Sequence, residues 1–238
     1  MRLLVVVAHP DDESFGCGSV LAAASAAGDE TVVLCATRGE AGESRIRTDD
    51  LAALREGELH EAARILGVGR VVLLGHADSG MDGEPAPGTL AAALTAAVVA
   101  EVLAVVDDVR PDVVVTLDAS DGHRDHAAIR DATLAAVDAA GSPPATYLWC
   151  LARSSMAKWA RHVHGHEAYL AMGDLGTPDD EITTVVDVSA HLETRWAAIH
   201  AHASQASPYE DLPEDLQYEF LATDRLRLVR GDDDVLAR

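Results

Sequence analysis

The chain has 238 residues, and 40 Asp and Glu against 18 Lys and Arg give it a formal net charge of −22 at pH 7. A surface this acidic repels phosphate backbones and anionic lipids, which excludes nucleic acid from the expected partners. No stretch approaches the roughly 18 apolar residues of a membrane-spanning helix, and no low-complexity linker divides the chain, so we expect one domain over residues 1–238.

Short apolar runs alternate with longer helical segments through the first part of the chain. The runs predict strands over residues 3–7, 31–36, 70–74 and 112–117. Helices are predicted after them, over residues 16–27, 49–66, 89–109 and 126–140. This alternation is typical of a parallel sheet, because each crossover places a helix on one face of the sheet.

The second part of the chain extends this pattern. Pro143 and Pro144 end the fourth helix, and residues 146–150 predict a fifth strand. Residues 182–188 predict a further strand, and a helix is expected over residues 190–203. We therefore predict an α/β fold, a Rossmann-like three-layer sandwich with a mostly parallel sheet. The expected strand order is about 3-2-1-4-5, with an extra strand and helices at the C-terminus.

The three cysteines, Cys17, Cys35 and Cys150, are far apart and lack any Cys-x-x-Cys spacing. Their number and spacing predict neither a disulfide framework nor a thiolate metal site. A reducing compartment suits such cysteines, and the stretch before His9 is too short for the apolar core of a signal peptide. We therefore expect a cytoplasmic protein.

The segment Ala8-His9-Pro10-Asp11-Asp12-Glu13 directly follows the first predicted strand. Because Pro10 ends that strand, we expect His9, Asp11 and Asp12 on the loop at its carboxyl end, where α/β enzymes place their sites. Alone, such a segment would more often be a polar loop that caps the next helix.

A second polar cluster, His123-Arg124-Asp125-His126, follows the fourth predicted strand. In the expected strand order, strands 1 and 4 are neighbours at the point where the chain leaves the sheet in opposite directions. The sheet topology alone therefore brings the two clusters to one crevice, which favours a shared site.

Imidazole and carboxylate side chains are the ligands that catalytic zinc takes, usually three of them with one position kept for water. His9, Asp12 and His126 can supply that set, which predicts Zn²⁺ as the cofactor, with Fe²⁺ as an alternative. Asp11, next to a ligand but free of the metal, is the candidate general base for the water.

His123 and Asp125 remain in the second cluster. If Asp125 holds His123 as an imidazolium, the ring can stabilise the oxyanion of a tetrahedral intermediate or protonate the leaving amine. We therefore predict a catalytic role for both residues.

The two clusters resemble the signature of the LmbE-like, or PIG-L, superfamily of zinc-dependent N-acetylglucosamine deacetylases. The resemblance covers most of the chain, through residues 37–43, positions 55, 58, 62 and 66–68, and residues 78–81 and 202–205. It implies the same metal ligands, with Asp11 as the base and His123 as the electrostatic partner. It also implies substrate contacts for Arg55 and Asp78, which match positions that bind the sugar or its aglycone in members that cleave glucosaminyl-inositol and mycothiol-type substrates.

Two positions depart from the family pattern. Arg124 stands where the second motif usually has Pro, and Asp121 stands where mycothiol-type members have Tyr. An ionised carboxylate cannot donate a phenol's hydrogen bond to an oxyanion, so a substrate other than glucosaminyl-inositol stays open.

The predicted function is a zinc-dependent N-deacetylase that removes acetate from an N-acetylglucosaminyl group on a small glycoside. The alternatives are an amidase acting on a larger mycothiol-type conjugate or secondary-metabolite glycoside, and a metal- or sugar-binding protein without turnover. With only nine Phe, Trp and Tyr residues in the chain, we expect a shallow polar crevice rather than an aromatic slot. The oligomeric state stays open, and a homo-oligomer is allowed.

Other interpretations are weaker. Gly16 and Gly18 hint at a dinucleotide-binding loop, but the third glycine of that fingerprint is replaced by Leu21. Arg55 and Glu58 lie three residues apart on a predicted helix, so they also fit a surface ion pair.

Overall fold

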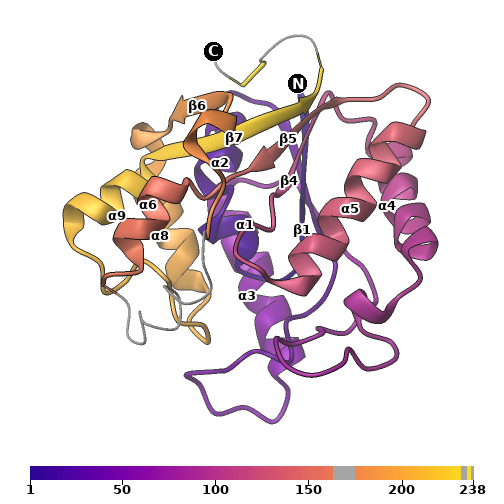
Figure 1. Ribbon diagram of the computed structural model, residues 1–238, viewed down its shortest axis with the longest axis horizontal. Helices are drawn as coiled ribbons and strands as arrows, with labels where there is room; N and C mark the ends of the chain where they lie inside the picture. The colour runs from indigo at the N-terminus through magenta and orange to yellow at the C-terminus, as the bar shows by residue number, and fades with distance from the viewer. Residues whose placement is uncertain (163–174, 232–234, 237–238) are drawn as a thin grey trace.

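The computed structural model describes residues 1–162, 175–231 and 235–236 (Figure 1). These residues contain one seven-stranded sheet with the order β3-β2-β1-β4-β5-β7-β6. Its strands are β1 (Arg2–Val7), β2 (Glu30–Cys35), β3 (Arg70–Leu73), β4 (Val113–Leu117), β5 (Ala145–Trp149), β6 (Thr184–Asp187) and β7 (Thr223–Arg230). The predicted order 3-2-1-4-5 is confirmed.

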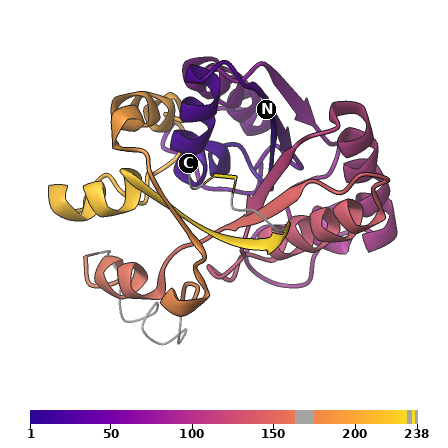
Figure 2. The ribbon, with the colours of Figure 1, turned by 90° about the horizontal axis from the view of Figure 1, so that it is seen from above.

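Helices cover both faces of the sheet, which confirms the three-layer sandwich (Figure 2). The helices are α1 (Asp12–Phe15), α2 (Gly18–Ala26), α3 (Leu51–Leu66), α4 (Thr95–Val109), α5 (Arg124–Ala139), α6 (Arg153–Trp159), α8 (Leu192–Ala201) and α9 (Glu214–Leu221). Helices α4 and α5 pack together on one face, and α2, α3 and α8 pack on the other. Among the described residues, no helix is both long enough and apolar enough to span a bilayer.

Strand β1 lies at the centre of the parallel part of the sheet. It pairs in parallel with β2 on one side and with β4 on the other. Residues 3–7 of β1 are fully buried, as expected for a strand covered on both faces. Because Val6 is in register with Thr116, the loops that leave β1 and β4 begin side by side at the carboxyl edge of the sheet.

The helix predicted over residues 16–27 corresponds to α2, and the short α1, which was not predicted, precedes it, with Gly16 and Cys17 between the two. A Cβ atom at Gly16 would lie 2.8 Å from the carbonyl oxygen of Asp12 and 3.3 Å from the Trp149 ring. Only glycine fits this approach, so the chain turns here, and the short α1 carries Asp12 at its first position.

The C-terminal part of the sheet differs from the expected single extra strand. Strand β6 matches the predicted segment 182–188, but β7 was not predicted, and it lies between β5 and β6, antiparallel to both. Alternating Leu and Arg side chains give β7 a pattern unlike the continuous apolar runs of the parallel strands. Helix α9, which precedes it, was also missed.

Arg195 on α8 ties this C-terminal part to α1. Its side chain is fully buried and forms a 2.9 Å ion pair with Asp224 of β7. Its guanidinium also donates hydrogen bonds to the carbonyl oxygens of Ser14, Phe15 and Gly16 at 3.2, 2.6 and 2.5 Å. Helix α1 has only four residues, so the carbonyl groups at its C-terminal end have no following turn to accept from. The Arg195 guanidinium supplies the missing donors.

Replacing Arg195 with Met should lower the free energy of unfolding by about 3–5 kcal/mol, because Asp224 would keep a buried charge without its partner. Adding Asp224→Asn should return part of that loss. The matched control is Arg64→Met, at an exposed ion pair with Glu61, which should stay within about 0.5 kcal/mol of the parent. Urea unfolding followed by circular dichroism measures all four proteins. Equal stability of the Arg195 and Arg64 variants would contradict this role.

Candidate active site

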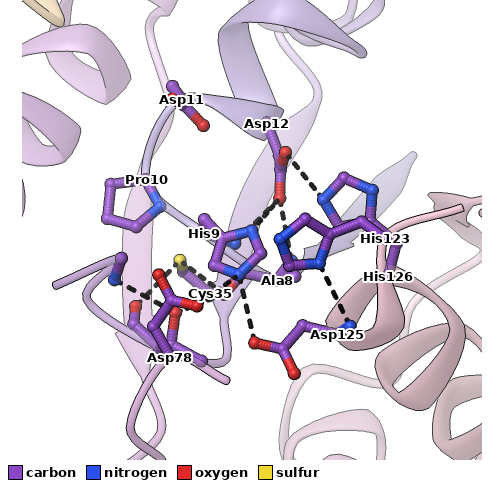
Figure 3. Close-up of polar contacts among 12 residues, drawn as sticks. Ala8, His9, Pro10, Asp11, Asp12, Cys35, Asp78, His123, Asp125 and His126 are labelled. Atoms are coloured by element: carbon purple, nitrogen blue, oxygen red, sulfur yellow. Dashed lines mark hydrogen bonds and ion pairs between the residues drawn. The ribbon is translucent and has the colours of Figure 1, made fainter. Parts of the chain in front are cut away.

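The loops after β1 and β4 bring three histidines around one carboxylate (Figure 3). Ring nitrogens of His9, His123 and His126 all lie within 4.8 Å of one another. A second group with the same spacing consists of His9, Asp78 and Asp125. We use the name His/Asp cluster for His9, Asp12, Asp78, Asp121, His123, Asp125 and His126.

Asp12 lies between two of the imidazoles. Its carboxylate accepts hydrogen bonds from the backbone N–H groups of Ala8 at 3.2 Å and His9 at 2.8 Å, which fix its position. Its oxygens lie 3.5 Å from His9 Nδ1 and 3.3 Å from His126 Nε2. Burial alone would raise the pKa of Asp12, but His126 and His9 hold that pKa well below its usual range. The three predicted metal ligands are therefore neighbours, with an ionised carboxylate in the middle.

A second carboxylate, that of Asp121, orients His126 by contacting the ring nitrogen that does not face Asp12. Asp121 Oδ2 lies 2.6 Å from His126 Nδ1, so the other ring nitrogen, Nε2, faces Asp12. Burial opposes protonation of His126, but Asp12 and Asp121 together raise its pKa to about 10. The sequence identified Asp121 only as a departure from the family pattern. The signal for its role is a carboxylate a few residues before a predicted ligand, where it can reach the far ring nitrogen.

His9 has the same arrangement. Its Nε2 lies 3.2 Å from Asp125 Oδ2 and 3.6 Å from Asp78 Oδ1, while its Nδ1 faces Asp12. Burial works against the charged ring, but the surrounding carboxylates raise the pKa of His9 well above its ordinary value. Asp78 is also held by the backbone N–H of Gly80 at 2.8 Å. The carboxylate that was expected to contact substrate thus faces a predicted metal ligand.

Asp11 stands beside the cluster without joining it. Its carboxylate is 3.0 Å from Arg55 Nη2, and its backbone has a φ of 110°, rare for any residue but glycine. Its N–H donates a 3.0 Å hydrogen bond to Glu13 Oε2, which holds this conformation. Burial raises the pKa of Asp11 to about 6, although Arg55 works in the opposite direction. The result is a carboxylate with a pKa near neutrality next to the predicted ligands.

Arg55 is a buried residue, so its interpretation as half of a surface ion pair is wrong. Its guanidinium donates to the carbonyl oxygens of Gly39 at 2.6 Å and of Pro10, in addition to Asp11. Glu58 is buried too, and it accepts hydrogen bonds from the backbone and hydroxyl of Ser204 at 2.8 and 2.6 Å. Helix α3 therefore points both side chains inward, Arg55 toward the loop that carries Asp11 and Glu58 toward Ser204 in the segment after α8.

The predicted imidazolium at His123 is a second expectation that the structure corrects. The carboxylate of Asp125 contacts His9 and the backbone N–H of Ser79, while the backbone N–H of Asp125 donates to His123 Nδ1 at 3.2 Å. Burial, together with the positive charges of His9 and His126, lowers the pKa of His123 to about 4. The ring is therefore neutral near pH 7, and Nε2 carries its proton.

A buried polar network behind Asp11 was missed at the sequence level. Glu13 and His202 are both fully buried as side chains, and they lie 2.7 Å apart. Glu13 also accepts a 2.6 Å hydrogen bond from the Ser14 hydroxyl. The resemblance included His202, but no local pattern connects it to Glu13, which lies in a distant part of the sequence.

A pocket of about 610 Å³ opens beside the cluster. Four of its lining residues, Asp12, Asp121, His123 and His126, belong to the His/Asp cluster. The other described lining residues are apolar or aromatic, and five of the nine aromatic residues of the chain are among them: Phe15, Trp149, Trp159, Tyr209 and Phe220. The expected shallow polar crevice is therefore wrong, because the few aromatic residues are concentrated at this one place.

Arg124, the other departure from the family pattern, points away from the cluster. Its guanidinium donates a 2.8 Å hydrogen bond to the carbonyl oxygen of Gly83. This hydrogen bond holds Arg124 against the segment that follows Asp78.

The residues of the cluster fit a divalent cation. Two imidazoles present one nitrogen each toward Asp12, and their opposite nitrogens are held by carboxylates, as is usual for histidine ligands. Asp125 Oδ1 is buried without a hydrogen-bond partner among the described residues. The carboxylates that raise the pKa of the neighbouring imidazoles also favour a bound metal ion. The ion and the protons compete for the same ring nitrogens.

Fold and site together define an α/β protein with a histidine–aspartate cluster of metal-ligand composition at the switch point of its sheet. The PIG-L family model, described as GlcNAc-PI de-N-acetylase, matches residues 4–137 of the chain. The chain belongs to the PIG-L family, as its sequence motifs predicted.

Relatives and solved structures agree with this assignment. The chain is 35% identical over 277 residues to a 1D-myo-inositol 2-acetamido-2-deoxy-alpha-D-glucopyranoside deacetylase of Geodermatophilus obscurus, covering 97% of this chain and 92% of the relative. It resembles a conserved protein of Thermus thermophilus, TT1542, with a TM-score of 0.61 and 25% identity, covering 98% and 96% of the two chains. A deacetylase–teicoplanin complex has a TM-score of 0.67 at 19% identity, covering 98% and 100%, and shares the fold.

Proposed function

We propose that this chain is a metal-dependent deacetylase that hydrolyses the acetamide of an N-acetylglucosaminyl group on a small glycoside, with Zn²⁺ as the expected ion and Fe²⁺ as the alternative. The observation that carries the proposal is the placement of Asp12 between His9 Nδ1 and His126 Nε2, with the buried carboxylate of Asp11 beside it. Relatives that are 35% identical across 97% of this chain are deacetylases of such a glycoside.

His9, Asp12 and His126 would hold the ion. When bound, the ion supplies Lewis acidity that polarises the acetamide carbonyl and makes water more acidic. Asp121 and Asp125 hold the far nitrogens of the two imidazoles, so that each ring keeps one orientation.

Asp11 acts as the general base in this proposal. A pKa of about 6 leaves most of the carboxylate ionised at pH 7, yet close enough to neutrality to accept a proton from the attacking water. The same carboxyl group then gives that proton to the departing amine nitrogen. Arg55 and Glu13 position Asp11 through its carboxylate and its backbone N–H, respectively.

His123 acts as a neutral hydrogen-bond donor. Its Nδ1 accepts from the backbone of Asp125, which leaves the Nε2 proton free to point at the oxyanion of the tetrahedral intermediate. Asp125 thereby fixes the tautomer of His123 with its backbone and the orientation of His9 with its carboxylate.

Arg55 and Asp78 are positioning residues in this proposal. The resemblance implied that they contact the sugar, but Arg55 holds Asp11, and Asp78 lies against His9. We expect both to act through the residues that they hold. The proposed location is a reducing cytoplasm, which is consistent with Cys17, Cys35 and Cys150 as free buried thiols.

The experiment is an assay of acetate and free amine. The purified protein, loaded with Zn²⁺ or Fe²⁺, is incubated with 1D-myo-inositol 2-acetamido-2-deoxy-α-D-glucopyranoside, simple N-acetylglucosaminides and N-acetyl amino acids. Release of equal amounts of acetate and glucosaminide amine is the expected result, with little from the amino acids. Metal binding without acetate from any substrate would favour the alternative of a binding protein that lacks turnover.

A further inference from the structure

Among the residues that the structure describes, the pocket beside the His/Asp cluster is polar only where it meets that cluster. Its volume, about 610 Å³, lies within the range of about 300–1,000 Å³ that is usual for small-molecule sites. Outside the four cluster residues, the described lining consists of aromatic, Leu, Met, Pro and Gly residues. The space next to the reacting group therefore offers mostly apolar contact.

The polar atoms of the aromatic lining residues have protein partners. Trp149 Nε1 donates to Asp224 at 3.3 Å, Trp159 Nε1 donates to the carbonyl oxygen of Pro208 at 2.9 Å, and the Tyr209 hydroxyl donates to the carbonyl oxygen of Phe15 at 2.9 Å. These bonds fix the rings and leave their apolar faces and edges to an occupant.

A hydroxyl-rich occupant would fit this lining badly. Each hydroxyl that loses water without gaining a hydrogen bond weakens binding. An apolar occupant is stabilised in proportion to the apolar surface that it removes from water, and stacking on aromatic rings adds to this. The lining therefore selects against a polyol and for an alkyl or aryl group.

The apolar walls are parts of the elements that carry the site. Phe15 lies on α1, three residues after Asp12, and Trp149 ends β5, next to the β4 strand that leads to His123 and His126. Helices α6 and α9 contact each other and complete the walls with Met156, Trp159 and Phe220 (Figure 1). A group bound there is within the same cavity as the reacting acetamide.

We infer that the glycoside which this protein deacetylates carries an aromatic or alkyl aglycone, and that this aglycone occupies the pocket lined by Trp149, Trp159 and Phe220. The inference rests on the proposed deacetylase function and narrows its substrate class. The reacting group is an acetamide in the proposed reaction, so the apolar group is placed on the glycosidic side of the sugar and not on the acyl side.

The test uses two matched substrate series with the Zn²⁺-loaded protein. The first varies the aglycone of N-acetylglucosamine from methyl to hexyl and phenyl, in both anomers. The second keeps the methyl aglycone and lengthens the acyl group from acetyl to hexanoyl. The expected result is a kcat/KM for the hexyl or phenyl glycosides at least about tenfold above that for the methyl glycoside, with no gain in the acyl series.

Two variants locate the effect. Met81 lines the pocket but is 58% exposed, so Met81→Asp adds a charge at the pocket without threatening the fold. Trp159→Ala removes part of the wall. Both should reduce the preference for phenyl over methyl several-fold. Tyr218→Ala is the matched control, because Tyr218 lies on α9 but is 55% exposed and is not a pocket residue.

A binding measurement separates the pocket from the chemistry. The neutral fluorescent probe N-phenyl-1-naphthylamine should bind the wild-type protein and be displaced by the phenyl glycoside but not by the methyl glycoside. Equal kcat/KM values for methyl and phenyl glycosides would overturn the inference while leaving the deacetylase intact. A gain that follows the acyl chain would also overturn it, by assigning the pocket to the acyl group. Absence of acetate from every glycoside would instead overturn the proposed function.

Discussion

Replacing Asp11 with Asn should lower kcat by about 10²- to 10⁴-fold, the usual contribution of a general base. The amide keeps the size of the side chain but cannot accept the proton of the attacking water. Metal content should remain at the wild-type level, because Asp11 contacts Arg55 and not His9 or His126. Steady-state kinetics and elemental analysis on the same preparation measure both quantities.

The control for this variant is Asp82→Asn, at an exposed position on a nearby loop, which should leave kcat unchanged. Loss of the metal in Asp11→Asn would identify Asp11 as a ligand. Wild-type turnover of the variant on an authentic substrate would remove Asp11 from the mechanism.

The His126→Ala variant should bind less than about a tenth of the Zn²⁺ that the wild-type protein binds. The substitution removes one of the proposed protein ligands of the ion. Asp121→Asn should retain the metal with about 10- to 100-fold weaker affinity, since it removes only the group that orients His126. His60→Ala, at an exposed position on α3, is the control. The measurement is elemental analysis after EDTA treatment and reloading, together with competition against a chromophoric chelator.

A thermal melt gives an independent check. Zn²⁺ should raise the Tm of the wild-type and His60→Ala proteins, because a ligand that binds only the folded state stabilises it. It should not raise the Tm of His126→Ala. Equal metal content and equal Tm shifts in wild type and His126→Ala would show that the ion, if bound, lies elsewhere.

Much of the fold could be predicted because its signals are local. The continuous apolar runs of β1 and β4, and the helices between the parallel strands, follow from the sequence and the rules for crossovers. Strand β7 could not be placed in the same way. It pairs with β5 and β6 through antiparallel contacts between segments far apart in the sequence. Its Leu226 and Leu228 also alternate with arginines, a pattern that predicts a strand with one exposed face.

The same distinction between local and long-range signals applies to the candidate site. His9, Asp11, Asp12 and the 123–126 segment could be predicted as one site, because they lie on the segments that leave β1 and β4, and the topology brings the ends of these strands together. The contacts that position these side chains and shift their pKa values could not be predicted. Glu13 pairs with His202, and Arg55 pairs with Asp11, across long distances in the sequence. No periodicity in the sequence predicts such pairs.

The aromatic pocket shows why composition can mislead. A chain with nine aromatic residues suggests little aromatic surface, yet five of them meet at one cavity. The residues come from α1, β5, α6, α9 and the segment before α9, so their convergence depends on the C-terminal part of the fold.

The position of β7 also has a consequence for synthesis. During translation, β5 emerges well before β7, so the nascent five-stranded sheet ends in an open edge with the sequence Ala-Thr-Tyr-Leu-Trp, Ala145–Trp149. Such an apolar, uncharged edge is a template on which a strand of another molecule can add. Chains that stall or are cut before Thr223 are therefore expected to self-associate through β5, whereas chains that contain β7 cover that edge with it.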